Sequence, residues 1–258
     1  MTGPRVVRSE WAKLWSLRST WVALALAVFC IVVPGLLSAD EYRAANGKWD
    51  ITAVDLSLLG VEFTHLVMGA LGVLVMAGEY STGLIRSTLA AVPRRLPVLF
   101  SKAAVYGVVA WVVGAVAAVG TFLGIGPILS GTEAAQSITE DGVIRTLLGV
   151  GLYLGLVGVI GVALGALLRS VAAGITVMFA LLFLVPVLVN ALAYVQPGSV
   201  WWDIYPYLPS VAGDAMHTAP QDADEPGLLT PTEGLLTLLG WCAAALAGAS
   251  LRLKLSDA

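Results

Sequence analysis

The sequence predicts an all-α membrane protein with six transmembrane helices. The 258 residues are 58% hydrophobic and 12% charged, with a mean hydropathy of +0.88. Soluble domains carry about 25% charged residues, so this chain has too few to cover a water-facing surface. Six stretches match the roughly 17–25 apolar residues that a helix needs to cross a bilayer. They are Trp21–Ser38, Leu56–Ala77, Val98–Ile125, Val143–Leu168, Val171–Val195 and Leu235–Leu251.

Each of these stretches is predicted to be helical, because backbone groups in lipid must be satisfied within their own segment. Long unbroken apolar runs do not fit the alternating pattern of a membrane β-barrel. We expect residues 1–258 to form one transmembrane domain. Cys30 and Cys242 fall within spans, so we expect them to pack as small apolar side chains and not to form a disulfide or bind a metal.

The basic residues predict the orientation. With the N-terminus inside, eleven of the 14 Lys and Arg residues lie on inner segments, and only Arg43, Lys48 and Arg145 lie on outer ones. The positive-inside rule then places both termini in the cytoplasm, in agreement with an even number of spans. The acidic residues lie mostly on the outer segments and give that face a negative potential.

Residues 1–19 are predicted to contain an amphipathic helix ahead of the first span. Val7, Trp11, Leu14 and Trp15 share one helical face, and basic residues lie opposite. A basic helix with tryptophans on its apolar side is typical of the inner headgroup region, where it contacts membrane lipid. The alternative is a simple basic tail that only sets the orientation.

A polar strip, residues 78–97, separates the second and third spans and is longer than a turn requires. Ser81 or Thr82 can cap a short helix, which Pro93 ends. Such a helix can rest its apolar face on a partner and present its arginines to anionic groups. The alternative is a basic anchor on anionic lipid, where each Lys or Arg contributes about 1 kcal/mol.

This strip resembles the cytoplasmic coupling loop in permease subunits of type-2 ABC exporters. Residues 8–21, R-S-E-W-A-K-L-W-S-L-R-S-T-W, are similar to the start of actinobacterial members of that family, and Tyr207–Met216 is similar to a motif before its last span. Leu84 departs from the family, in which threonine is common at that position. The residues in the strip and just after it that carry the resemblance are Glu79, Tyr80, Gly83, Arg86, Leu89, Pro93, Arg94, Arg95 and Lys102.

The resemblance implies the permease subunit of an ATP-driven exporter in a bacterial cell membrane. A separate ATPase subunit would dock on the strip and hold ATP and Mg, and a second permease, identical or different, would complete the path. This chain would bind no cofactor and catalyse no reaction. Its only Gly-Lys pair, Gly47-Lys48, lacks the upstream glycine of a phosphate-binding loop and lies on the outer side. We expect no nucleic-acid partner.

The outer segment, residues 196–232, opens with aromatic residues that suit the membrane–water interface. In the resembling family the chain dips back into the outer leaflet here. Tyr207, Pro209 and Gly213 are therefore the candidate residues of a re-entrant turn.

One polar constellation falls within a span. Glu62 and His65 are three residues apart and share a helix face. Acids inside lipid are costly and suggest function. Arg145, Tyr153 and Asn190, toward the outer ends of other spans, could face them. Three hypotheses follow: a polar cavity for a substrate group, a structural Glu62–Arg145 pair, and a metal site, for which two ligands are too few.

Two other functions stay open. A non-transporting sensor or scaffold could hold a soluble partner through the basic strip. A membrane hydrolase or transferase is the third, although no convergent set of acids, bases and nucleophiles is evident. The apolar interior suits a lipid, a hydrophobic natural product or a peptide equally well as a substrate.

Overall fold

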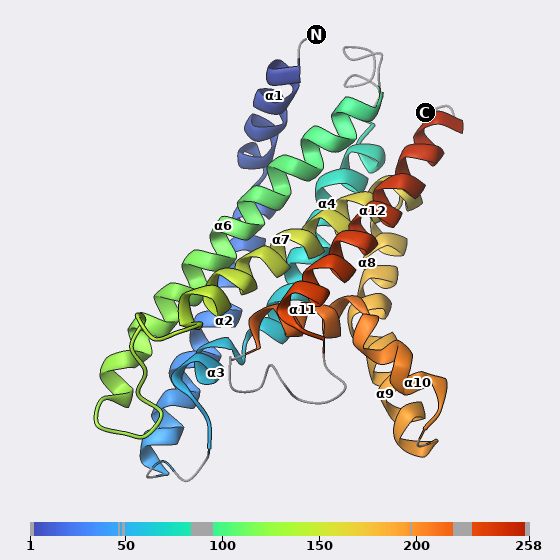
Figure 1. Ribbon diagram of the computed structural model, residues 1–258. Helices are drawn as coiled ribbons and strands as arrows, with labels where there is room; N and C mark the ends of the chain where they lie inside the picture. Colours follow the sequence, from blue (N-terminus) through green and yellow to red (C-terminus); the bar gives the residue numbers. More distant parts are fainter. Residues whose placement is uncertain are drawn as a thin grey trace.

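The computed structural model describes residues 3–45, 47, 50–83, 95–196, 198–218 and 229–255. Within these ranges every regular element is a helix, and six stretches are long and apolar enough to cross a membrane (Figure 1). The predicted all-α, six-span membrane architecture is thus confirmed. The elements are α1 (Gly3–Ser16), α2 (Arg18–Ala44), α3 (Ala53–Leu58), α4 (Val61–Ser81), α6 (Arg95–Leu129), α7 (Val143–Leu168), α8 (Val171–Phe179), the π-helix η1 (Ala180–Leu184), α9 (Val185–Val195), α10 (Val200–Ile204), the 3-10 helix η2 (Tyr205–Tyr207), α11 (Pro209–His217) and α12 (Pro231–Leu255).

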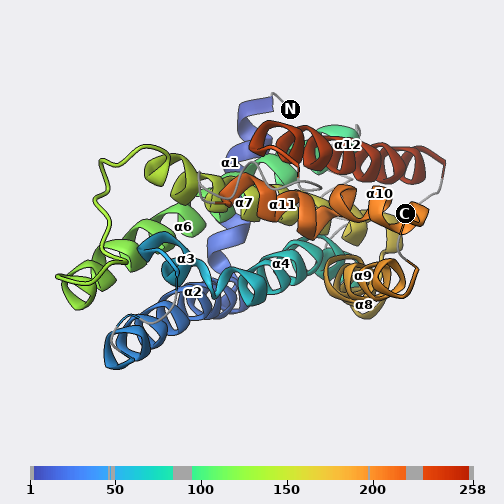
Figure 2. The same cartoon turned by 60° about the horizontal axis from the view of Figure 1, so that its bottom comes forward.

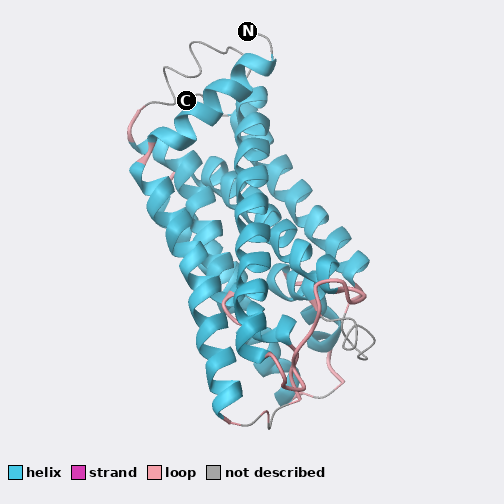
Figure 3. Ribbon diagram, turned by 90° about the vertical axis from the view of Figure 1, so that its left-hand side faces the viewer, coloured by secondary structure: helices cyan, strands magenta, loops and turns pink. Residues whose placement is uncertain are grey.

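Both described ends of the chain lie at the same end of the bundle, as an even number of spans requires (Figures 1 and 3). We call this the terminal end. Which side of the membrane it faces stays a prediction. The chain also leaves α4 at Ser81 and enters α6 at Arg95 at this end of the bundle.

Helix α7 is the centre of the bundle. It packs against α4, α6, α11 and α12, and Figure 2 shows it lying with α11 between α4 and α12. Glycines make this close packing possible: a methyl group at Gly161 would lie 2.3 Å from the Gly69 carbonyl oxygen, and one at Gly155 would lie 2.8 Å from that of Gly107. The glycines of α7 therefore serve helix packing within this chain.

The second span is interrupted rather than continuous. The chain ends α3 at Leu58, turns through Gly60 and starts α4 at Val61. Gly60 lies against α2 so closely that a methyl group there would be 1.7 Å from the Cys30 carbonyl oxygen. Only glycine allows that approach, so the interruption lies where two helices cross.

The winding of the fifth span changes just before a proline. A π-helical segment, η1, comes just before Pro186, which sits in the first turn of α9. Proline cannot donate a backbone hydrogen bond, and a wider turn before it removes the need for one. The fifth span thus accommodates Pro186 directly after the π-helical turn η1.

The N-terminal helix α1 packs against the start of α6 and contacts α2. Its buried face carries Val6, Glu10 and Leu14, whereas Val7 and Trp11 of the predicted apolar face are 43% and 47% exposed. The predicted apolar face is therefore divided: Val7 and Trp11 point away from the bundle, as contact with lipid would require, whereas Leu14 is buried and Trp15 packs against the core. Its position in the headgroup region stays a prediction.

Candidate functional site

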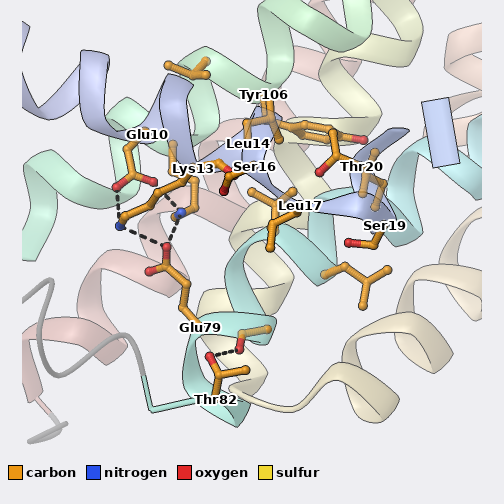
Figure 4. Close-up of a pocket in the computed structure, with 16 residues that line it drawn as sticks. Glu10, Lys13, Leu14, Ser16, Leu17, Ser19, Thr20, Glu79, Thr82 and Tyr106 are labelled. Atoms are coloured by element: carbon orange, nitrogen blue, oxygen red, sulfur yellow. Dashed lines mark hydrogen bonds and ion pairs between the residues drawn. The ribbon is translucent and has the colours of Figure 1, made fainter. Parts of the chain in front are cut away.

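Four charged side chains from three helices meet at the terminal end of the bundle (Figure 4). Glu10 and Lys13 come from α1, Glu79 from the last turn of α4, and Lys102 from α6, two turns after its start. We call these four residues the ion cluster. The Lys102 Nζ donates to Glu79 Oε1 at 2.9 Å and also to Glu10 Oε2. The Lys13 Nζ donates to Glu10 Oε1 at 2.9 Å and to Glu79 Oε1 at 3.1 Å.

Three of the four side chains in the ion cluster are buried, and the cluster is balanced in charge. The side chains of Glu10 and Lys102 are only 2% and 4% exposed, and that of Glu79 is 10% exposed. Two carboxylates face two ammonium groups, so each buried charge has a partner, as burial in a protein requires. At Lys13, partial burial by itself lowers the pKa. The hydrogen bonds and negative charges of Glu10 and Glu79 outweigh burial and raise the pKa of Lys13 above its usual 10.5.

Glu79 faces into the protein rather than outward. The sequence predicts this residue as a contact of a partner ATPase, but its carboxylate points at α1 and α6. Its second oxygen, Oε2, is buried without a hydrogen bond in the described part of the chain. In this geometry the Glu79 carboxylate does not face outward toward a docked protein. It links the end of α4 to α1 and α6 through its bonds to Lys13 and Lys102.

The end of α4 is also held from a second direction. The Arg169 guanidinium lies over the Tyr80 ring, 5.3 Å from its centroid, within the range of a cation–π interaction. Arg169 is the last residue before the turn into α8 and has a φ of 54°. Left-handed geometry is unfavourable for a residue with a side chain, by about 1–2 kcal/mol. Tyr80 thus connects α4 to the α7–α8 turn.

Gly83 closes the described part of α4 with a φ of +73°, which favours glycine and turns the chain away from the helix axis. The Ser81 and Thr82 hydroxyls both bond back to the Gly78 carbonyl oxygen, so they finish α4. The predicted coupling helix and its residues Arg86, Leu89, Pro93 and Arg94 lie outside the described residues. The backbone of Arg95 begins α6.

A cavity of about 230 Å³ lies beside the ion cluster, between α1, α2, α4 and α6 (Figure 4). The four charged residues line one part of it. Most of the remaining wall is apolar, with Leu17, Leu71, Val75 and Val105 among its residues. The ion cluster is therefore packed against a partly hollow region, not against a fully dense core.

A second polar group lies away from the terminal end, where α4, α7 and α11 meet. The Tyr153 hydroxyl and His65 Nδ1 are 3.1 Å apart, and both side chains are fully buried. The Tyr153 ring also packs against His217, with ring centroids 5.7 Å apart. Two of the residues predicted to face each other, His65 and Tyr153, therefore do so.

The re-entrant residues build the wall of this second group. Helix α11 follows Tyr207 and begins at Pro209; it is almost entirely buried, and Figure 1 shows it set back from the far ends of α2 and α9. Gly213 is pressed on the ring of Tyr153: a methyl group there would lie 2.0 Å from its Cε2 atom. This position admits only glycine, and α11 therefore holds Tyr153 against His65.

Glu62 and Asn190 line one cavity of about 420 Å³ between α4, α9 and α11, as one of the sequence hypotheses predicts. Arg145 is elsewhere: its guanidinium donates to the Thr218 carbonyl oxygen at 3.1 Å. No ion pair joins Glu62 to Arg145 in the part of the chain that the structure describes, which argues against the structural pair. Nor do the described residues bring three potential metal ligands together.

Sequence reasoning missed Glu10 and Lys13 of the ion cluster, and Asp214 and His217 of the second polar group. Glu10 is the only acid among the basic residues of α1, which was a usable signal.

Comparison with known proteins adds no identification: no protein-family model matches the chain, and no curated protein matches it.

Proposed function

We propose that this chain is the membrane-spanning subunit of an ATP-driven exporter and that a separate ATPase binds the strip between α4 and α6. The ion cluster is the observation that carries the proposal. Glu79 lies at the start of the strip and Lys102 just after its end, and their direct bond of 2.9 Å joins the two ends of the strip. Both also bond to α1.

A partner that pushed on the strip would move three helices together. The contacts of the ion cluster are buried and charge-balanced, so they resist being pulled apart one at a time. Tyr80 and Arg169 extend the same connection to the turn between α7 and α8. Closely packed helices shift as units rather than deform. The terminal end of this polytopic membrane protein can therefore transmit movement from the strip to several helices. A passive membrane anchor would not need such a connection.

The resemblance of the strip to a coupling loop supplies the identity of the partner. The strip contains three arginines, Arg86, Arg94 and Arg95, which can pair with acidic groups of a docked protein. Glu79 serves a different purpose in this account: it transmits movement and does not touch the partner.

Affinity purification from the native membrane, followed by an ATP hydrolysis assay, tests the proposal. We expect the wild-type chain to bring a stoichiometric ATPase with it. Arg86→Ala removes a docking charge and should lose the ATPase. Glu79→Gln should keep the ATPase bound but change its hydrolysis rate, because only the transmission is broken. Glu41→Gln, at an exposed position at the opposite end of α2, is the matched control and should behave as wild type.

A stable, intact preparation that contains no ATPase would contradict the proposal. It would favour the sensor or scaffold, which binds a soluble partner through the strip without moving a substrate.

A further inference from the structure

The cavity between α4, α9 and α11 has an unusual combination of walls. Its apolar side is formed by Leu182, Phe183, Pro186 and Val187. Its polar side is formed by Glu62, Asn190, Ser210 and Asp214. Its volume of about 420 Å³ falls within the ~300–1,000 Å³ that is common for small-molecule sites.

The charges on these walls are all of one sign. Two carboxylates, Glu62 and Asp214, line the cavity, and none of the described residues that line it is a lysine, arginine or histidine. Glu62 lies in the first turn of α4, inside a membrane span, and has no ion-pair partner among the described residues. Asp214 has two histidines near it: His217, whose Nε2 is 3.5 Å from Asp214 Oδ1, and His65, which also interacts with it electrostatically. An acid in a span without a protein partner implies a partner from outside the chain.

A buried hydroxyl independently marks the same cavity as a binding site. Ser210 is a buried residue, only 5% exposed, and its hydroxyl lines the cavity without a hydrogen bond to the described part of the chain. This oxygen is open to the cavity and can therefore bond to a polar group there. Asp214 Oδ1 is buried and also lacks a hydrogen bond within the described residues, whereas buried polar groups are nearly always hydrogen-bonded. Asn190 adds an amide that can both donate and accept on the same side.

We propose that this cavity binds a cationic amphipathic molecule, with its ammonium group between Glu62 and Asp214 and its hydrophobic part against η1 and α9. The aromatic residues Phe183 and Tyr205 also line the cavity, and aromatic faces attract cations. A carboxylate or phosphate ligand is disfavoured, because it would face two acids without a compensating base. The inference rests on the proposed function only in making this ligand the exported substrate; the binding itself needs no ATPase.

The test is equilibrium binding of radiolabelled decylamine to the purified full-length chain in phosphatidylcholine nanodiscs, with empty nanodiscs giving the background from lipid partitioning. We expect saturable binding of decylamine to the wild type, with competition by unlabelled decylamine but not by decanoate. Glu62→Gln and Asp214→Asn should each weaken binding about tenfold or more, and Ser210→Ala a few-fold, as expected for lost hydrogen bonds to a charged group.

Glu41→Gln and Asp203→Asn change exposed acids outside the cavity and should leave binding unchanged. Thermal unfolding of each variant shows that the fold is retained. Wild-type affinity in both Glu62→Gln and Asp214→Asn, equal competition by decanoate, or the absence of saturable binding above empty nanodiscs would each overturn the proposal. Because decanoate is tested on the wild-type chain, the proposal stays falsifiable even if a variant does not fold.

The outcome is separable from that of the proposed function. Decylamine binding without a co-purifying ATPase would leave the cavity proposal standing and remove the exporter. An ATPase that co-purifies with a chain unable to bind decylamine would do the reverse.

Discussion

Removing Lys102 tests whether the ion cluster holds the terminal end of the bundle together. In Lys102→Met, Glu10 and Glu79 are left to share Lys13, so one buried negative charge loses its compensation. Two unit charges 2.9 Å apart interact by about 6 kcal/mol at an effective dielectric constant of about 20. The cost of breaking a buried pair is smaller, about 3–5 kcal/mol, because the desolvation of the removed charge is recovered.

Thermal unfolding of the detergent-solubilised chain measures this effect. For a chain of this size, about 3–5 kcal/mol corresponds to a fall in Tm of roughly 6–20 °C. Lys254→Met, which removes an exposed lysine near the end of α12, is the matched control and should leave Tm within about 1 °C, as expected for a surface change.

A double variant separates charge balance from the loss of the lysine itself. Glu79→Gln combined with Lys102→Met leaves Glu10 and Lys13 paired at 2.9 Å with no surplus charge. Most of the lost Tm should return. A double variant as unstable as Lys102→Met, or a Lys102→Met chain as stable as wild type, would refute the reasoning.

Three further predictions follow from other contacts. Gly161→Ala should lower the free energy of unfolding by about 1–3 kcal/mol, because its methyl group would meet the Gly69 carbonyl; Gly126→Ala, where nothing lies within 4 Å, should be neutral in the same unfolding assay. Tyr153→Phe should cost about 1–3 kcal/mol, because it leaves His65 Nδ1 buried without its bond, and equal Tm values for the two chains would contradict this. The raised pKa of Lys13 means that its ion pairs contribute fully to stability below pH 10.5 and are lost as the pH rises through the higher folded-state pKa; Tm measured against pH should therefore fall above 10.5, and less so in Lys13→Met.

The spans were predictable because lipid leaves few alternatives. A long apolar run can only be a helix there, so composition and length give the number of spans and their approximate positions. The interruption at Gly60 was not predictable. It depends on the Cys30 carbonyl of another helix, and nothing in the local sequence reports that contact.

The second polar group also shows that sequence alone does not predict contacts between distant segments. Spacing along one helix placed Glu62 and His65 on one face, but the partners of each came from distant segments. Tyr153 was found because it lies at the matching depth of another span, whereas Asp214 and His217 lie on α11, a short helix within what reads as a loop. Arg145 matched in charge and depth, yet it bonds to Thr218. The depth of a residue in its span and its charge identify candidate partners, but the packing of the helices decides which side chains meet.

Glu10 was missed for a related reason. In a basic amphipathic helix a single acid reads as part of the solvated face, but α1 turns that side chain toward Lys102 of α6. A hydrophobic face predicts which side of a helix avoids water. It does not predict whether lipid or protein covers that side, and here Val7 and Trp11 are left outside the bundle whereas Leu14 of the same face is buried.

Photo-crosslinking from the strip tests the central claim most directly. A benzoylphenylalanine placed at Leu89 in native membranes should give one dominant adduct with a nucleotide-binding protein, and Arg86→Ala should abolish it. The same group at Glu41 should give no such adduct. An adduct at Leu89 with lipid alone would contradict the account, because the strip would then be a membrane anchor and not the docking surface of an ATPase.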